Sequence, residues 1–263
     1  GKADFFIMTP VAQQGEWLAR QEATYLITYP SNLEAMLRHC QDKKIRFPTL
    51  REVQTMSELL KPSTRELCRE VWDVPVTDIY TCQEVGYIAL QCPGHQHYHA
   101  QSENMIIEVL KGDGSPARAG ETGKVVITHL HNFASPLIRY DIGDFAEVGE
   151  PCPCGRNLPV LKRIVGRVRG MVTLPNGDQF WPFFSNRKFI EVAPVRQYQI
   201  VQKTLDSLEV NLVTDRKLVV KEEDKLRDLI AKRLGHPFAM TFSYFDEIPR
   251  GKGGKFEDFK SEL

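Results

Sequence analysis

The segment from Pro136 to Asp144 is followed two dozen positions later by the dipeptide Gly166-Arg167. Strand-forming residues lead into an expected turn that ends on the Asp144 carboxylate. An aspartate has two acceptor oxygens, enough for both hydroxyls of a ribose, and an arginine supplies several donors for the same sugar or a nearby phosphate. The pattern predicts a nucleotide-binding site at Asp144 and Arg167. The alternative is an ordinary loop with an exposed Asp-Arg pair, and the other motifs of the chain favour the nucleotide site.

A second candidate lies at Tyr80-Thr81-Cys82-Gln83-Glu84-Val85-Gly86, where a strand is expected to end. Tyr80 offers an aromatic face for a base, and Glu84 offers a carboxylate for a metal ion that is bound to the phosphates of a nucleotide. The spacing alone is also typical of a strand followed by a loop with an exposed glutamate. The segment Gly120-Glu121-Thr122-Gly123-Lys124 invites comparison with a phosphate-binding loop. We reject that interpretation because no glycine lies five residues before Gly123 and a strand, not a helix, follows.

The elements that must position these residues alternate between strand and helix in the first part of the chain. We expect helices at residues 14–20, 32–40 and 63–72 and strands at residues 23–29, 51–56 and 76–80. This alternation indicates an α/β layer with a largely parallel sheet, whose ligands bind at the carboxyl ends of the strands. Alternating strands at residues 104–110 and 124–130, separated by turn formers, predict antiparallel strands or a small distorted barrel.

The pattern changes after Arg169 and predicts a small α+β domain. A hairpin is expected at residues 171–183 because Asn176-Gly177 is a strong turn signal. Further strands are expected at residues 198–201, 207–213 and 240–245, and an amphipathic helix at residues 221–234. We assign Trp181 and Phe183 to the core of this domain.

Composition limits the classes of function. The chain has 263 residues, of which 42% are hydrophobic and 26% charged, and it carries 34 basic and 34 acidic residues. This balance gives no basic surface for nucleic acid. No signal peptide is evident near Gly1, and no apolar run approaches the roughly 18 residues of a membrane span, so we expect a cytoplasmic protein. Six unevenly spaced cysteines are typical of reduced thiols rather than of a disulfide framework.

Four motifs occur in a fixed order: Tyr80-x-x-x-Glu84-x-Gly86, Arg139-Tyr140-Asp141-Ile142-Gly143-Asp144, Gly166-Arg167 and Gly253-Gly254-Lys255. Together they resemble the adenylate-forming superfamily. The tract from Tyr29-Pro30-Ser31-Asn32-Leu33 to Cys152-Pro153-Cys154-Gly155-Arg156 is similar to its phenylacetate–CoA ligase branch. The resemblance covers nearly the whole chain. It implies that residues 1–166 are the second half of the large adenylation domain, a mixed sheet plus a small distorted β-barrel. Residues 167–170 would be a hinge and residues 171–263 the small mobile C-terminal domain.

The resemblance implies that ATP activates a carboxylic acid, an aromatic acid being one candidate. The acyl-adenylate then passes to a thiol, that of coenzyme A or of a carrier protein. Glu84 matches the glutamate that binds Mg²⁺. Lys255 matches the lysine of the small domain that offsets the charge developing between the carboxylate and the α-phosphate. A flexible surface lysine is the alternative for Lys255.

The resemblance also assigns residues to the nucleotide. Tyr80 would lie against adenine, and Asp144 would hold the ribose hydroxyls with help from Arg167. The segment Ser57-Glu58 loosely matches the backbone that lines the adenine pocket. Gln83 replaces the threonine of the family and can still donate to a phosphate. At the hinge, Arg169-Gly170 replaces the usual acidic or basic pair, and the freedom of a glycine suits a rotation there.

One expected part is missing from the sequence. The Ser/Thr/Gly-rich loop followed by lysine, which holds the β- and γ-phosphates in the superfamily, has no counterpart in residues 1–50. Residues 1–10 also begin with neither an initiator methionine nor an obvious first element. We expect a piece of a longer enzyme, a half-enzyme completed by an upstream polypeptide, or a protein that no longer adenylates. All three predict that this chain alone is inactive in ATP–pyrophosphate exchange.

Four of the remaining residues predict a structural zinc site. Cys92, His99, Cys152 and Cys154 provide three thiolates and an imidazole, a closed tetrahedral set that also occurs in the similar branch. His95 and His97 compete with His99 for the fourth position. The alternative is a group of scattered thiols and surface histidines. We expect Cys40 and Cys68 to be core thiols, and Cys82 not to be a nucleophile.

Two functions fit the sequence. The first is part of an AMP-forming acyl- or aryl-CoA ligase, and we favour it. The second is a nucleotide-binding or assembly module that has lost catalysis. The residues that would line the acyl pocket lie mostly upstream, so the sequence leaves the acid and the oligomeric state open.

Overall fold

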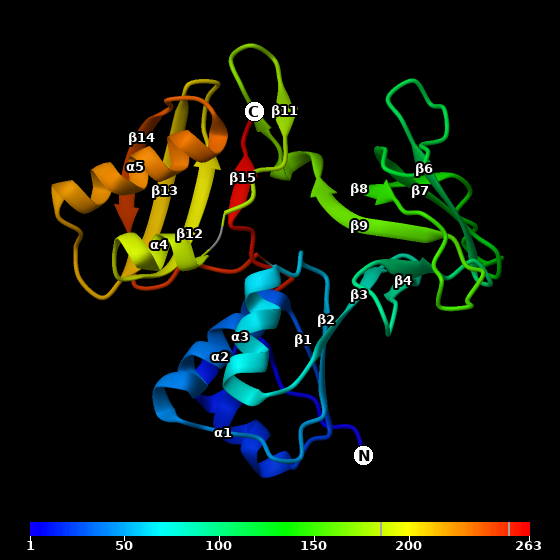
Figure 1. The fold of residues 1–263 in the computed structure, drawn as a ribbon, viewed down its shortest axis with the longest axis horizontal. Helices are drawn as coiled ribbons and strands as arrows, with labels where there is room; N and C mark the ends of the chain where they lie inside the picture. Colours follow the sequence, from blue (N-terminus) through cyan, green and yellow to red (C-terminus); the bar gives the residue numbers. More distant parts are fainter. Residues whose placement is uncertain (185, 252) are drawn as a thin grey trace. The chain divides into compact units, whose positions relative to one another are not determined.

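The chain was studied as a computed structural model that describes residues 1–184, 186–251 and 253–263. It divides into two compact units, Gly1–Gly166 and Arg167–Leu263 (Figure 1). Each unit is described by itself below.

The first unit contains three helices and one nine-stranded sheet. The strand order is β1-β2-β3-β4-β5-β9-β8-β7-β6, in which β1 to β3 are parallel and the pairs β3–β4, β4–β5, β5–β9, β6–β7 and β7–β8 are antiparallel. Its elements are α1 (Val11–Gln21), β1 (Tyr25–Thr28), α2 (Pro30–Lys43), β2 (Glu52–Met56), α3 (Pro62–Trp72), β3 (Val76–Cys82), β4 (Gly86–Gln91), β5 (Tyr98–Ala100), β6 (Met105–Leu110), β7 (Thr122–His129), β8 (Tyr140–Val148) and β9 (Val160–Arg167).

Helices α1, α2 and α3 form a core with the parallel strands. Pro30 and Pro62 begin α2 and α3, where a proline costs no hydrogen bond, and Lys44 and Asp73 end them in the left-handed conformation. The core contains the fully buried Leu33, Leu37, Val53 and Cys68. The prediction that Cys40 and Cys68 are core thiols is confirmed, and burial raises the pKa of Cys40 to about 11. The expected α/β alternation is also confirmed.

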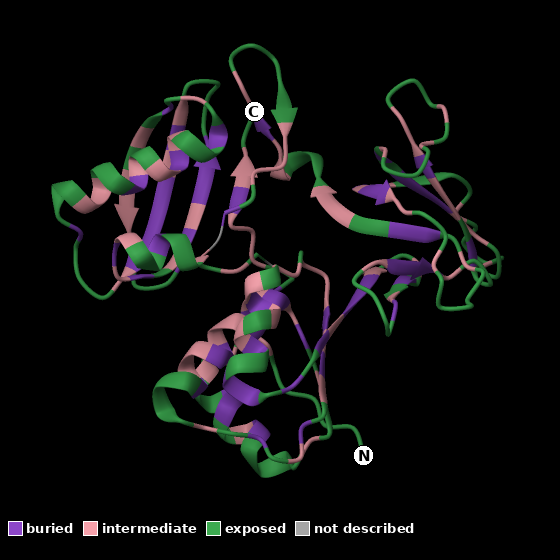
Figure 2. Cartoon of the chain, in the orientation of Figure 1, coloured by how far each residue is buried: buried purple, intermediate pink, exposed green. Residues whose placement is uncertain are grey.

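The remaining strands form an open sheet rather than the small barrel expected from the sequence. Among the described strands β1 and β6 lie at opposite ends of the sheet, so the sheet does not close on itself. A second cluster of buried residues, which includes Ile88, Met105, Val125 and Ile127, packs along β4 to β7 (Figure 2). A period-2 pattern gives the faces of each strand but not which strands are neighbours, and this is why the sequence did not decide between sheet and barrel.

The position of Asp144 also differs from the expectation. The sequence predicted a turn that ends at Asp144, but β8 begins at Tyr140 and continues through Asp144 to Val148. Gly143, inside this strand, has a φ of 76°. This left-handed conformation is typical of turns, and glycine adopts it within the strand without strain. Asp144 therefore has the fixed backbone of a strand residue.

The described residues of the second unit form a four-stranded sheet, a two-stranded hairpin and two helices. The order β14-β13-β12-β15 combines an antiparallel β12–β13 pair with parallel β13–β14 and β12–β15 pairs. The elements are the 3₁₀ turn Val168–Gly170, β10 (Val172–Thr173), β11 (Gln179–Phe180), α4 (Asn186–Val192), β12 (Val195–Gln202), β13 (Ser207–Thr214), α5 (Val220–Leu234), β14 (Ala239–Tyr244) and β15 (Phe259–Ser261).

The small α+β domain, its hairpin and its long helix are as predicted, but neither Trp181 nor Phe183 belongs to its buried core. Leu226, Ile230 and Leu234 of α5 are buried against Ile200 and Leu212 of the sheet. Phe183 is 44% exposed, and the neighbouring Phe184 is buried instead. Two adjacent phenylalanines before a helix give no periodicity, so the sequence could not decide between them.

None of the helices among the described residues is long and apolar enough to cross a membrane. The hinge at residues 167–170 stays a prediction.

Candidate functional site

The predicted nucleotide residues of the first unit lie at one edge of its sheet. Strands β1, β2 and β3 are parallel neighbours, so their carboxyl ends share this edge. Ser57 and Glu58 follow β2, and Gln83 and Glu84 follow β3. This is the edge at which parallel α/β sheets bind their ligands.

The turn after β2 is strained and held by a helix. Ser57 lies at φ 71°, a left-handed conformation that non-glycine residues rarely adopt outside functional or tightly constrained positions. The Glu58 carboxylate accepts hydrogen bonds from the Ser31 backbone N–H at 2.8 Å and from the Ser31 hydroxyl at 3.0 Å. Because Ser31 is in the first turn of α2, the acidic side chain caps that helix. The carboxylate therefore fixes the turn that contains Ser57.

Tyr80 and Asp144 meet although 64 residues separate them in the chain. The Tyr80 hydroxyl, on β3, donates to Asp144 Oδ2, on β8, at 2.9 Å. Tyr80 is 7% exposed and Asp144 8% exposed. The sequence predicted both as nucleotide-binding residues, and the structure adds that the tyrosine orients the carboxylate. The ring itself is mostly covered within this unit, which the sequence did not predict.

Glu84 lies in the exposed turn between β3 and β4, next to Gln83. The Tyr140 hydroxyl donates to Glu84 Oε1 at 3.4 Å. Tyr140 was part of the motif around Asp144, but nothing in its spacing indicated a contact with Glu84. A carboxylate in an exposed turn suits a magnesium ligand, because Mg²⁺ prefers carboxylate oxygen and retains several waters.

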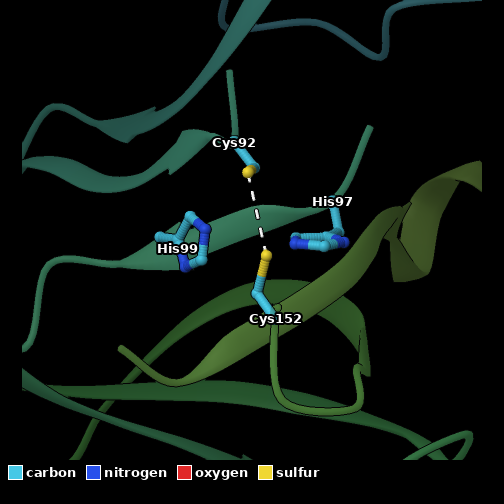
Figure 3. A group of neighbouring side chains, drawn as sticks. All are labelled: Cys92, His97, His99 and Cys152. Atoms are coloured by element: carbon cyan, nitrogen blue, oxygen red, sulfur yellow. Dashed lines mark hydrogen bonds between the residues drawn. The ribbon is translucent and has the colours of Figure 1, made fainter. Parts of the chain in front are cut away.

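A cluster of cysteine and histidine side chains lies at the turn end of the β4–β5 hairpin, where Cys152 from the segment before β9 meets it (Figure 3). Donor atoms of Cys92, His97, His99 and Cys152 all lie within 4.8 Å of one another, and the sulfurs of Cys92 and Cys152 are 3.8 Å apart. Cys154 Sγ lies 3.4 Å from His99 Nε2. The six cysteines, all among the described residues, are free thiols. The structure therefore brings three of the predicted ligands, Cys92, His99 and Cys152, together with His97, and it places the fourth predicted ligand, Cys154, beside His99.

The donors of this cluster have the chemistry of a metal site. His97 Nε2 and His99 Nδ1 are buried and have no hydrogen-bond partner among the described residues, which a bound ion would supply. The backbone N–H of Arg156 is the main cause that lowers the pKa of Cys154 to about 6, so this sulfur is a thiolate at neutral pH. Burial and the neighbouring His95 and His99 lower the pKa of His97, which favours the neutral imidazole that metals require.

The remaining predicted residues, Arg167 and Lys255, belong to the second unit. The Arg167 side chain is exposed, and its carbonyl accepts a hydrogen bond from Trp181 Nε1 at 2.9 Å. Lys255 is exposed at the end of a turn in which the Gly251 N–H donates to the Lys255 carbonyl at 2.9 Å. Arg250 donates to the Gly254 carbonyl at 3.1 Å and supports this turn. Residue 252 of the predicted loop lies outside the described residues.

Known proteins resemble both units. Residues 184–262 match the CapK C-terminal domain family. Over 210 residues the chain is 28% identical to the phenylacetate-coenzyme A ligase of Thermus thermophilus, a match that covers 69% of this chain and 47% of that protein. Over 150 residues it is 28% identical to protein CapK of Staphylococcus aureus, covering 52% of this chain and 31% of CapK. The chain thus spans at most about half the length of these curated relatives.

Solved structures share the fold at low sequence identity. A 2-hydroxyisobutyryl-CoA ligase in complex with 2-HIB-AMP has a TM-score of 0.78 and 18% identity, over 96% of this chain and 57% of that one. The anthranilate CoA ligase AuaEII in complex with anthranoyl-AMP has a TM-score of 0.69 and 16% identity, over 94% of this chain and 51% of that one.

Proposed function

We propose that this chain, which is similar in sequence and fold to the C-terminal portion of phenylacetate–CoA ligase-like, adenylate-forming enzymes, forms the part of an acid–thiol ligase that binds AMP. The observation that carries the proposal is the hydrogen bond from Tyr80 to Asp144 beside the carboxyl end of β3. It orients a buried carboxylate at the edge of a parallel sheet, where a ribose with two adjacent hydroxyls would find two acceptors.

In the proposed reaction the substrate carboxylate attacks the α-phosphate of ATP, and the bond to pyrophosphate breaks. Asp144 holds the ribose and Arg167 donates to the same sugar. The backbone at Ser57 bounds the adenine, and Tyr80, whose ring is mostly covered, acts on the nucleotide through its hydrogen bond to Asp144. These contacts fix the α-phosphate relative to the acid, which removes much of the entropic barrier of a reaction between two molecules.

Charge builds up as two anions approach one another. The Lys255 ammonium, on an exposed turn whose backbone is fixed by hydrogen bonds, offsets this charge in the transition state. Glu84 and Gln83 face the phosphates, and Glu84 would hold the Mg²⁺ that neutralises the leaving pyrophosphate. In the second step the sulfur of coenzyme A, or of a carrier protein, attacks the acyl carbonyl and AMP leaves.

In this proposal, the residues that bind the β- and γ-phosphates belong to another polypeptide segment. No Ser/Thr/Gly-rich loop followed by lysine occurs in residues 1–50. A polypeptide segment that carries this loop would hold the β- and γ-phosphates and much of the acid, as a second chain or as part of a longer one.

The cysteine and histidine cluster is a structural zinc site in this proposal. Cys92, His99 and Cys152 belong to either possible set of four. We assign the fourth position to Cys154, because its sulfur lies 3.4 Å from His99 Nε2. His97, whose buried Nε2 has no partner among the described residues, is the alternative fourth ligand. A closed set of four ligands leaves no position for a substrate, so zinc would tie the β4–β5 hairpin to the segment before β9. Zinc analysis of Cys154→Ser and His97→Asn separates the sets: loss of zinc from His97→Asn alone would contradict this assignment.

ATP–pyrophosphate exchange tests the proposed activity. The chain is mixed with the N-terminal portion of the Thermus thermophilus relative and with a series of aliphatic and aromatic acids. We expect little exchange from either part alone and acid-dependent exchange from the mixture. Lys255→Ala should lower that exchange about 100-fold, as removal of a single charge stabiliser does elsewhere, whereas Lys221→Ala on α5 should not. Strong exchange by the chain alone, or equal exchange by Lys255→Ala, would contradict the proposal.

A further inference from the structure

A buried polar network crosses four neighbouring strands, β2 to β5. Asp78 on β3 is 6% exposed. Its carboxylate accepts hydrogen bonds from Thr55 Oγ1 at 2.5 Å and from the Tyr98 hydroxyl at 2.6 Å.

Gln91, on the strand between them, completes the network. Its Oε1 accepts from the Asp78 backbone N–H at 2.8 Å and from Arg65 at 2.7 Å. Gln91 and Tyr98 are directly opposite one another in the β4–β5 pair. The side chains of Asp78, Gln91 and Tyr98 thus lock β3, β4 and β5 in register, because a shifted strand would leave a buried charge without its donors.

Each end of this network adjoins a candidate functional residue. Cys92 directly follows Gln91, and His99 directly follows Tyr98, so two of the proposed zinc ligands are attached to it through the backbone. Tyr80 is two residues beyond Asp78 and therefore on the same face of β3. The Tyr80 hydroxyl orients Asp144, as described above.

We propose that Tyr98 is a positioning residue that couples the metal cluster to the nucleotide site through Asp78, so that bound metal strengthens AMP binding. This inference rests on the proposed function, because it needs the AMP site at Tyr80 and Asp144. When metal fixes Cys92 and His99, the ends of β4 and β5 cannot move apart, and the Tyr98 donor stays on Asp78. Without metal the hairpin loosens, the hydrogen bond weakens, and the end of β3 that carries Tyr80 loses its support.

The coupling is reciprocal by thermodynamic linkage. If metal raises the affinity for AMP by some factor, AMP raises the affinity for metal by the same factor. We expect a factor of at least about 5, the lower end of measured couplings between sites. The effect of metal on AMP affinity and the effect of AMP on metal affinity are measured separately and should agree. Neither measurement depends on catalysis.

The test is isothermal titration of AMP into zinc-loaded and chelator-treated protein, together with a zinc competition assay with and without AMP. The wild-type chain should bind AMP at least about fivefold more tightly with zinc than without it. Tyr98→Phe, which keeps the ring and removes only the hydroxyl, should bring this ratio close to one while the variant still binds zinc.

One variant serves as a control. Tyr87→Phe removes a hydroxyl from an exposed tyrosine on β4, 53% exposed, and should change nothing.

Each contrary result has its own meaning. A wild-type ratio of one overturns the coupling, even if Tyr98→Phe fails to fold. A ratio of five or more in both the wild type and Tyr98→Phe overturns the role of Tyr98. Absence of AMP binding by both zinc-loaded and zinc-free wild type overturns the proposed function and this inference with it.

Discussion

Replacing Cys92 by serine should separate the contribution of the metal from that of the polypeptide. Cys92 is 2% exposed and its sulfur lies 3.8 Å from that of Cys152. Serine has nearly the same shape but is a poor zinc ligand, since zinc in structural sites is held by thiolates and imidazoles. The variant should therefore lose stoichiometric zinc without leaving a large cavity.

The size of the effect follows from linkage. Free zinc at 100 times its dissociation constant stabilises the folded state by about 2.7 kcal/mol. The first unit has 166 residues, a size at which 1 kcal/mol shifts the melting temperature by about 2–4 °C. The wild type should therefore melt about 5–11 °C higher in buffered zinc than in chelator, and Cys92→Ser should melt at one temperature in both.

Differential scanning calorimetry in a reducing buffer measures these shifts, with atomic emission analysis of zinc in the same samples. Cys82→Ser is the matched control, because Cys82 is a half-buried thiol outside the cluster and should keep the zinc-dependent shift. The metal assignment is refuted if Cys92→Ser retains one zinc per chain, or if zinc changes the melting temperature of the wild type and of Cys92→Ser equally.

Three further outcomes are expected. Tyr80→Phe should weaken AMP binding about 3- to 10-fold by calorimetry, because it removes one hydrogen bond that orients Asp144; an unchanged affinity would contradict this. Glu147→Gln should lower the free energy of unfolding in urea by about 1–2 kcal/mol at pH 7, because Lys162 and then Arg163 stabilise the charged form of this buried carboxylate. Those contacts lower the pKa of Glu147, so its contribution is complete above the ordinary value of 4.5 and is lost as the pH falls through the folded-state pKa; a difference that grew on acidification would contradict this. Phe189→Ala should destabilise the second unit by about 3–5 kcal/mol, since the ring is 1% exposed and stacks on Tyr198 at 4.1 Å; a loss below about 1 kcal/mol, measured by urea unfolding, would show that the packing is loose.

The sequence predicted those parts of the site that depend on local spacing. Tyr80 and Glu84 lie at the end of a strand as expected because strand-forming residues and a glycine bound that segment. Cys92, His99, Cys152 and Cys154 were recognised as a possible zinc site because their thiols and imidazole together form a set of four metal ligands. Asp144 was recognised by its motif, although its motif gave the wrong local structure, since Phe145 to Val148 continue the strand.

The parts that the sequence could not predict depend on which strands are neighbours. The contact between Tyr80 and Asp144 joins β3 to β8, and the contact between Tyr98 and Asp78 joins β5 to β3. The alternation of a single strand fixes its two faces but carries no information on its partners. The sequence left His95, His97 and His99 as competing ligands, and the structure places both His97 and His99 in the cluster.

Titration of AMP into the zinc-loaded chain, compared with Asp144→Asn and Asp141→Asn, tests the central claim most directly. Asp141 is an exposed aspartate on the same strand, and asparagine can still accept the hydrogen bond that Asp141 receives from the Gly143 N–H. Asp144→Asn should weaken AMP binding about 10- to 100-fold, corresponding to about 1.5–3 kcal/mol for hydrogen bonds to a charged group, and Asp141→Asn should leave it unchanged. Equal affinities for the wild type and Asp144→Asn would contradict the proposal that this carboxylate holds the ribose.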